Sequence, residues 1–317
     1  MSNIPSFVTI GEAMAMFVAD TPGELSQVIS FSRSLAGAEV NVAIGMARMG
    51  FHSTYITKVG NDSFGEFIKE SIQHEKIQTN HILESTTNAT GFMLKSNVTD
   101  GSDPKVEYYR RNSAASTLST EDIDSILFHQ QPHLHLTGVS VAVSESLRDA
   151  AKQALNLAKE QGCRVSFDTN LRPALWPDQA TMIKEINNFA FASDIVLPGI
   201  EEGKILAGSD QPEEIADFYL HHGSQAVVVK LGSKGAYYKT RTGESGTVAG
   251  FPVNKVVDTV GAGDSFAVGV ISALLDGQTM AQAARRGNLL GSLTVQVRGD
   301  SEGLPTRDVL SELEKAD

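Results

Sequence analysis

The chain contains the stretch Asp258-Thr259-Val260-Gly261-Ala262-Gly263-Asp264, followed directly by the apolar run Ser265-Phe266-Ala267-Val268-Gly269-Val270-Ile271. Two glycines around an alanine suit a turn with open backbone N–H groups, and the run that follows has helical length and spacing. The turn therefore ends at a helix N-terminus, where unpaired N–H groups and the helix dipole favour an anion. A carboxylate at Asp264 could take the proton of an attacking hydroxyl beside a bound phosphoryl group. An ordinary helix N-cap after a Gly-rich loop is the alternative interpretation.

The whole string is more specific than a lone Gly-x-Gly, and it resembles the C-terminal signature of the ribokinase (PfkB) family of sugar and nucleoside kinases. The resemblance implies that Asp264 is the catalytic base. It implies that the amides of Gly261, Ala262 and Gly263 form the anion hole. It also implies ATP with Mg²⁺ as the phosphoryl donor, and it leaves open a requirement for a monovalent cation.

Composition limits the class of protein. The 317 residues are 41% hydrophobic and 20% charged, as in a globular protein with a sizeable core. The formal charge of −12 argues against a nucleic-acid or anionic-membrane surface. The single cysteine, Cys163, excludes an internal disulfide framework and a Cys-based metal cluster. No uncharged apolar run is long enough to span a bilayer and no export signal is recognisable, so we expect a cytoplasmic protein.

Strand-like and helix-like segments alternate along most of the chain, which predicts right-handed βαβ units and a mostly parallel sheet. The predicted strands are 7–10, 54–59, 133–137, 164–167, 194–197, 226–230, 236–239 and 246–257. The predicted helices are one within 36–50 and those at 63–74, 146–161, 178–192, 201–207, 213–222, 265–271, 280–295 and 306–314. The helix that starts at Ser63 has capping-box spacing to Glu66. The fold class is therefore α/β, and the resemblance specifies a ribokinase-like sheet flanked by helices.

Two segments break the alternation. Residues 12–35 read as a strand and hairpin, and residues 89–111 read as two extended runs around a turn at 99–104. Neither has a helix to cover it, so we expect the two to pair into a small β-sheet lid. The expected division is a core of residues 1–11, 36–88 and 112–317, with 12–35 and 89–111 as the lid.

Residues 36–50 predict a helix that opens with small residues, which would let a ligand approach the backbone closely. Asn41, in its first turn, could hydrogen-bond a sugar hydroxyl; an ordinary helix with a glycine start is the alternative. The stretch resembles the N-terminal signature of the same kinase family, which implies that Gly37 contacts substrate.

Two further segments combine cations with a position at the end of a strand. In Asp168-Thr169-Asn170-Leu171-Arg172 the alternate residues can point to one side, at a strand end where open α/β sheets bind ligands. In Tyr108-Tyr109-Arg110-Arg111 the pair Tyr108 and Arg110 shares one face of an extended run. A structural salt bridge and a solvated sheet edge are the respective alternatives. The resemblance implies that Tyr108, Arg110 and Arg172 contact substrate.

Lys230-Leu231-Gly232-Ser233-Lys234-Gly235-Ala236 follows an apolar strand and resembles the nucleotide loop of the family, although a plain hairpin turn would need the same residues. The resemblance places Gly232, Ser233, Gly235, Asn170 and Asn288 at the nucleotide, together with Gly261 and Gly263.

Metal-binding residues are few. No histidine cluster has zinc spacing, and His133 and His135 are expected on a strand with one exposed face. Relatives use an Asn-x-x-Glu motif to support Mg²⁺ indirectly. Glu202 matches its last position, whereas Gly199 stands where the Asn would be.

Within the family the quoted segments resemble 2-keto-3-deoxygluconate kinases most. That resemblance implies phosphorylation of the primary hydroxyl far from a carboxylate, and the arginines agree because a planar guanidinium binds a carboxylate as a fork. A fructokinase or another neutral-sugar kinase is the first alternative. A non-catalytic sugar sensor on the same fold is the second, and a nucleotide-binding oxidoreductase is weaker because no Gly-x-Gly-x-x-Gly follows the first strand. We expect a small sugar acid and ATP as partners, no nucleic acid and no membrane; homo-oligomerisation remains open.

Overall fold

The central sheet collects strands from both halves of the chain. The computed structural model describes residues 4–98, 104–130 and 132–316. Its strands are β1 (Ser6–Ile10), β4 (His52–Gly60), β5 (Ile82–Ser85), β8 (His133–Thr137), β9 (Val165–Asp168), β10 (Ile195–Val196), β11 (Ala226–Lys230), β12 (Gly235–Thr240) and β13 (Ser245–Ala249). Within the described residues they lie in the order β13-β12-β11-β10-β9-β8-β1-β4-β5. Only the pairs β11–β12 and β12–β13 are antiparallel, so the predicted mostly parallel sheet is confirmed.

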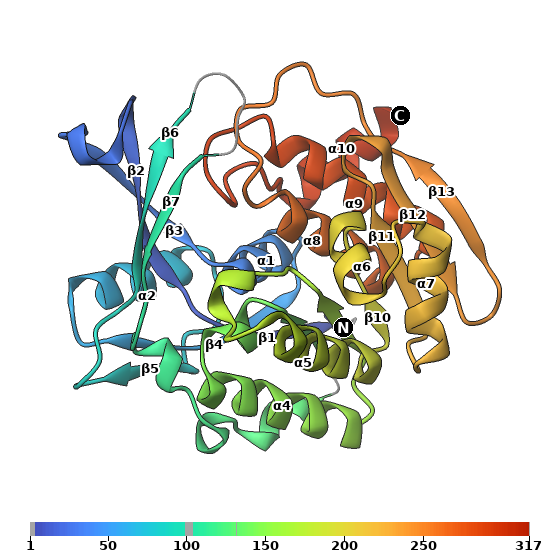
Figure 1. Ribbon diagram of the computed structural model, residues 1–317, viewed down its shortest axis with the longest axis horizontal. Coiled ribbons are helices and arrows are strands. Elements are labelled where there is room, and N and C mark those ends of the chain that lie inside the picture. Colours follow the sequence, from blue (N-terminus) through green and yellow to red (C-terminus); the bar gives the residue numbers. More distant parts are fainter. Residues whose placement is uncertain (1–3, 99–103, 131, 317) are drawn as a thin grey trace.

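Helices cover both faces of this sheet (Figure 1). One face carries α4 (Glu145–Glu160), α5 (Gln179–Ala192), α6 (Ile200–Leu206) and α7 (Pro212–His221). The other carries α1 (Ala38–Arg48), α2 (Ser63–His74), α8 (Ala262–Leu275), α9 (Met280–Thr294) and α10 (Arg307–Ala316). A short helix, α3 (Ser140–Val143), follows β8. The ribokinase-like α/β fold expected from the sequence is thus observed.

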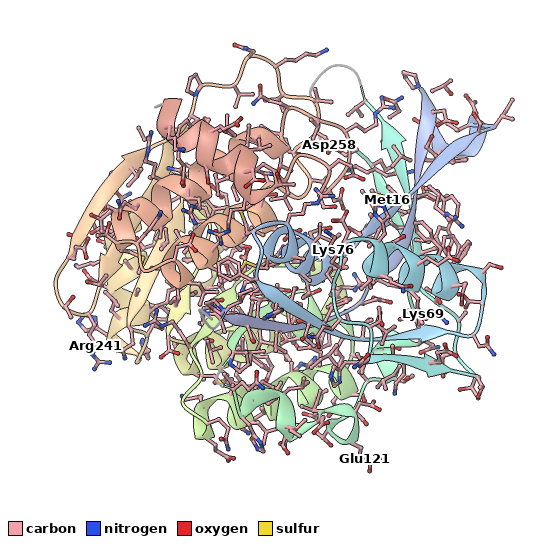
Figure 2. The ribbon with its side chains drawn as sticks, turned by 180° about the vertical axis from the view of Figure 1, so that it is seen from behind. Met16, Lys69, Lys76, Glu121, Arg241 and Asp258 are labelled. Carbon is pink, nitrogen blue, oxygen red and sulfur yellow. The ribbon has the colours of Figure 1, made fainter. Side chains whose placement is uncertain are left out.

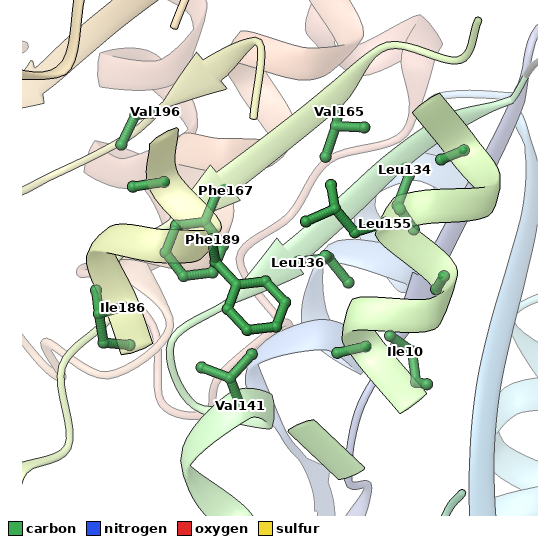
Figure 3. Packing of buried hydrophobic residues seen from close by; sticks show 14 of the residues in the cluster. Ile10, Leu134, Leu136, Val141, Leu155, Val165, Phe167, Ile186, Phe189 and Val196 are labelled. Carbon is green, nitrogen blue, oxygen red and sulfur yellow. The ribbon is translucent and has the colours of Figure 1, made fainter. Parts of the chain in front are cut away.

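Strands β10 and β11 send side chains into two separate cores. In β11, Val227 and Val229 belong to the core under α4 to α7, whereas Val228 belongs to the core under α8 and α9. Figure 3 shows the first core, where Phe167 of β9 stacks on Phe189 of α5 with ring centroids 5.8 Å apart. Burial on both faces explains the continuous apolar runs of β10 and β11.

A second, smaller sheet stands apart from the first (Figure 1). Its strands are β2 (Met14–Pro22), β3 (Phe31–Ala36), β6 (Phe92–Asn97) and β7 (Val106–Tyr109), in the order β3-β2-β6-β7. On its inner face Met14, Met16 and Met93 pack together. The two irregular segments of the sequence therefore do pair. Of the turn predicted at 99–104, residues 99–103 lie outside the described residues.

Three local expectations were wrong. The run 246–257 is a strand only to Ala249, because Pro252 has no N–H to donate and the chain then turns toward α8. The cap of α2 is the Asp62 side chain, which accepts from the N–H groups of Phe64 and Gly65; Ser63 is the first helical residue. Strand β5, between α2 and the small sheet, was not anticipated, because its sequence Ile-Leu-Glu-Ser is short and half polar.

The histidines of β8 also differ from the expectation of an exposed face. His133 and His135 are both buried, and each ring shares a 2.8 Å hydrogen bond with the Ser166 hydroxyl. Burial lowers the pKa of both rings to about 3, so they are neutral. The strand lies in the middle of a parallel sheet, where neither face is wet. Among the described residues no helix has both the length and the apolar character required to cross a membrane.

Candidate active site

The turn that precedes α8 has the geometry expected of an anion site. Gly261 is the residue before the helix, with a φ of 82° that a side chain would strain, and a Cβ there would clash with the carbonyl oxygen of Asp300. The first N–H groups of a helix have no acceptor within the helix. Because the turn brings Ala262 and Gly263 to this position, their amides and the helix dipole can hold a phosphoryl group.

Asp264 lies in the first turn of α8 and is 8% exposed. Its carboxylate accepts a 2.8 Å hydrogen bond from Asn41 Nδ2 and a longer one, 3.4 Å, from Asn170 Nδ2. Burial raises its pKa, the hydrogen bond from Asn41 lowers it and the nearby Asp168 carboxylate raises it, so that the pKa lies at about 8. A buried carboxyl with a pKa near the working pH is suited to general base catalysis.

Asn41 was expected to meet a sugar hydroxyl, and the structure places its amide nitrogen on Asp264 instead. Its Oδ1 is buried and has no hydrogen-bond partner among the described residues. The residue thus orients the carboxylate with one end and keeps a free acceptor on the other. Asn41 comes from α1, whose approach to β1 requires Gly37, because a Cβ there would clash with the Glu12 carbonyl oxygen.

A cavity of about 380 Å³ opens above Asp264, between the central sheet and the small sheet. All the residues assigned to substrate from the sequence line it, namely Gly37, Asn41, Tyr108, Arg110 and Arg172. They come from α1, from the end of β7 and from the loop after β9. The structure thus brings together residues more than a hundred positions apart in the chain.

The two arginines in this cavity differ in their partners. Arg110 donates from Nε to Glu12 Oε2 at 2.6 Å, and its guanidinium also lies over the Tyr108 ring. Arg172 donates to its neighbouring Leu171 carbonyl and has no carboxylate partner among the described residues. Arg172 is exposed and available for an anion, whereas Arg110 is held by Glu12 and presents only its remaining edge.

A third cation, Lys230, lines the same cavity. Lys230, the last residue of β11, donates to Asp168 Oδ1 at 2.6 Å. Burial works against its charge, but the carboxylates of Asp168 and Glu202 more than offset that, so the pKa of Lys230 lies above its usual value. Lys230 and Asp168 therefore form an ion pair close to the Cα of Gly263.

A second cavity of about 610 Å³ lies on the other side of the turn. It is lined by Gly232, Ser233, Gly235 and Asn288, the residues assigned to the nucleotide from the resemblance. The Asn288 amide nitrogen donates to the carbonyls of Val248 and Ala249 and so ties α9 to β13. Lys230, Thr259 and Gly263 line both cavities. The two cavities therefore meet at the turn.

Three residues assigned to the nucleotide or to its metal ion from the resemblance do not line the second cavity. Gly261 lines only the first cavity. Asn170 lines the first cavity beside Asp264 rather than the second. Glu202 lines neither cavity, since its carboxylate accepts hydrogen bonds from Thr169 Oγ1, Leu171 N and Gly199 N at 2.6, 2.8 and 2.7 Å. Among the described residues no group of three or more acidic, His or Cys side chains could hold a metal ion by itself.

Sequence reasoning did not anticipate the roles of Glu12 and Lys230. Each comes at or directly after the carboxyl end of a strand of the main sheet, the edge where open α/β sheets bind ligands. That rule was applied to Asp168 and could have found both. Asp300, which packs against the turn from an irregular C-terminal segment, carries no comparable signal.

Comparison with known proteins gives consistent matches over the full length. The family described as pfkB family carbohydrate kinase matches residues 5–307. The chain is 50% identical over 305 residues to a 2-dehydro-3-deoxygluconokinase of Bacillus subtilis (strain 168), covering 96% of this chain and 94% of that protein. A PfkB protein from Polaromonas sp. JS666 superposes with a TM-score of 0.89 at 45% identity, covering 97% of this chain and 99% of that one. A putative ribokinase II from E. coli, solved in complex with ATP and Mg²⁺, superposes with a TM-score of 0.90 at 28% identity, covering 99% of this chain and 100% of that one.

Proposed function

Because the chain belongs to the pfkB family of carbohydrate kinases and is therefore a sugar kinase, we propose that its substrate is 2-keto-3-deoxygluconate, also called 2-dehydro-3-deoxygluconate. The reaction is transfer of a phosphoryl group from ATP to the primary hydroxyl of the sugar acid. The observation that carries the proposal is the unpaired Arg172 at the mouth of a cavity whose floor is Asp264.

The electrostatics of the first cavity favour an acid over a neutral sugar. The protein has a formal net charge of −12, yet Arg110, Arg172 and Lys230 all line this cavity. Lys230 is neutralised by Asp168 and Arg110 by Glu12, which leaves the charge of Arg172 for a ligand. A guanidinium binds a carboxylate through two parallel hydrogen bonds, and a neutral ketose gains little from that cation.

Asp264 acts as the general base in this proposal. Its carboxylate, oriented by Asn41, takes the proton of the primary hydroxyl as the oxygen attacks. The amides of Ala262 and Gly263 at the start of α8 stabilise the charge on the transferred phosphoryl group. Lys230, which is paired with Asp168, lies at the junction of the two cavities. The free Oδ1 of Asn41 accepts a hydrogen bond from the sugar.

The second cavity fits the nucleotide. It is lined largely by glycines and apolar residues, and it adjoins the N-terminus of α8. ATP bound there supplies the phosphoryl group. The described residues offer no cluster of carboxylates for Mg²⁺, so the ion would be held chiefly by the phosphates. Glu202 contributes by fixing the loop that carries Asn170 and Arg172.

The direct test is ADP release by the purified protein with 2-keto-3-deoxygluconate, gluconate, fructose and ribose, each titrated to saturation. We expect kcat/KM for 2-keto-3-deoxygluconate to exceed that for fructose by at least about tenfold, since one charge-assisted contact is involved. A preference for fructose would overturn the sugar-acid assignment and leave the sugar kinase activity intact.

The pH profile follows from the pKa of Asp264. The base works only when it is ionised, and its pKa is raised to about 8. We therefore expect kcat/KM to rise about tenfold per pH unit below that value and to level off above it. The measurement is kcat/KM at saturating ATP from pH 5.5 to 9.5. A profile that is already flat at pH 6 would show that the base has an ordinary carboxyl pKa in the free enzyme.

We also propose that the small sheet acts as a lid over the sugar, because Met14, Met93, Tyr108 and Arg110 from its strands or their ends line the first cavity. Hydrogen exchange of β6 and β7 should therefore slow by about tenfold or more when the sugar acid is bound, whereas α4, on the far side, should be unchanged. Equal exchange of β6 with and without substrate would contradict closure.

A further inference from the structure

Lys95 is a charged residue buried in the small sheet, on the same face as Met93. It lies on β6, in register with Val18 of β2 and Val106 of β7. It is 1% exposed, and its neighbours on the same face of the strand, Met93 and Asn97, are also buried. A buried ammonium destabilises a fold unless it is fully paired. The partners of Lys95 therefore indicate its role.

Those partners belong to the core. Lys95 Nζ lies 2.6 Å from Asp258 Oδ2 and 3.0 Å from Asp300 Oδ1. Both carboxylates are buried, at 7% and 3% exposure. Burial disfavours the ammonium, but Asp300 and Asp258 more than offset this and raise the pKa of Lys95 above its usual value. Figure 2 shows Asp258 on the side of the core that faces the small sheet.

Asp258 belongs to the anion-binding turn, and Asp300 belongs to the segment that packs against it. Asp258 is the first residue of the turn, and its other oxygen, Oδ1, accepts a 3.1 Å hydrogen bond from the N–H of Val260. The backbone of Asp300 packs so closely on Gly261 that a Cβ would clash with it. The ammonium therefore holds the two sides of the turn whose amides face the phosphoryl group.

A second contact joins the same elements. Arg298, from the segment that leads to Asp300, donates to Asn97 Oδ1 at 3.0 Å, and Asn97 donates to the Asp20 carbonyl at 3.2 Å. Two buried residues of β6 thus hold the irregular segments on either side of the turn. These contacts of Lys95 and Asn97 are not required for a strand that only covers the sugar.

We propose that Lys95 is a positioning residue for phosphoryl transfer, and that its ammonium acts as a fixed internal cation between Asp258 and Asp300 that keeps the Gly261 turn in its anion-binding form. The proposal rests on the transfer taking place at this turn. It makes the small sheet part of the catalytic machinery as well as a cover.

The geometry has a chemical consequence for monovalent cations. K⁺ and NH₄⁺ are close in size to a lysine ammonium and are attracted by the same pair of carboxylates. In the intact protein the position between Asp258 and Asp300 is filled by Lys95 Nζ, so added K⁺ should not be needed there. Removing the ammonium leaves two buried carboxylates facing a space that a small cation can neutralise.

The test compares wild type and Lys95→Met in choline chloride and in KCl at equal ionic strength, with the sugar that the wild type phosphorylates best. We expect the wild-type kcat to differ by less than about twofold between the salts. The variant should lose about tenfold or more in kcat in choline chloride, with a smaller change in KM for the sugar, and KCl or NH₄Cl should restore at least about a third of the loss. Its unfolding midpoint should rise in KCl, and that of the wild type should not.

The matched control is Lys58→Met, which breaks the 2.7 Å ion pair with Asp122 away from both cavities and should show no salt-specific change. A wild-type kcat more than about threefold higher in KCl than in choline chloride would overturn the proposal. If the Lys95→Met variant does not fold, this comparison on the wild type is by itself the test of the proposal. Loss of activity in Lys95→Met that no cation restores, with no midpoint shift, would overturn it as well. Because the sugar is chosen by activity, a wrong sugar-acid assignment leaves this test valid.

Discussion

Replacing Asp264 by Asn will lower kcat by about two to four decades, the usual loss for a general base. The amide keeps the shape of the side chain and can still accept the hydrogen bond from Asn41 Nδ2, but it cannot take a proton. Binding of ATP in the second cavity should change little, because Asp264 lines only the first. The measurement is single-turnover phosphorylation together with nucleotide binding by calorimetry.

The unfolding temperature of the same variant distinguishes loss of the base from damage to the fold. The pKa of Asp264 is raised in the folded protein, so the stability that comes with its protonation is present at low pH and is lost as pH rises through about 8. Asn carries no charge at any pH. We therefore expect Asp264→Asn to unfold at a higher temperature than wild type at pH 8.5, with a smaller difference at pH 5. A folded variant that retained more than about a tenth of the wild-type kcat would remove Asp264 from the role of base.

Replacing Arg172 by Met will lower kcat/KM for 2-keto-3-deoxygluconate by about one to two decades, because a charge-assisted hydrogen bond is worth about 1.5–3 kcal/mol. Activity on a neutral sugar should change much less, since no carboxylate is there to lose the cation. The kcat/KM of Arg172→Lys for the sugar acid should lie between those of the wild type and of Arg172→Met, because a lysine keeps the charge and loses the planar fork. The measurement is kcat/KM for each sugar at saturating ATP.

Arg172 gives a cleaner test than Arg110. Removing Arg110 also leaves the buried Glu12 carboxylate without its ion-pair partner, so a loss of activity there could come from the fold. Arg241→Met is the matched control, because Arg241 is exposed and lies far from Asp258 in Figure 2. Equal losses on the sugar acid and on fructose in Arg172→Met would contradict the assignment of the carboxylate to this arginine.

Much of the fold follows from local pattern. The bounds of α2, β8 and β11 match the prediction to the residue, because each is a complete periodic run between clear breaks. The prediction that Tyr108 and Tyr109 lie on opposite faces of the strand is also confirmed. Tyr108 lines the cavity and Tyr109 stacks on Phe92 on the other face of the small sheet, with ring centroids 4.7 Å apart.

What could not be predicted depends on contacts between distant segments. The resemblance implies that Arg110 and Arg172 contact substrate, but only the fold shows that Glu12 pairs with Arg110 and that Arg172 has no carboxylate partner among the described residues. Nothing in the local sequence distinguishes Lys95 from other polar residues of a strand, because its two partners lie more than 150 residues away. The role of a residue that depends on a distant ion-pair partner cannot be recognised from the local sequence, whereas a glycine in a strained turn can be.

The parallel pairing of β2 with β6 also bears on how the chain acquires its structure. Ala15 lies opposite Phe92, so this contact closes a loop of about 75 residues that contains α1, β4, α2 and β5. Closing a loop of that length is entropically unfavourable until the elements within it have docked. We expect the small sheet to form late during folding, after β1 and β4 have paired. It would then be the part of the protein in which local unfolding exposes the sugar cavity without disturbing either hydrophobic core.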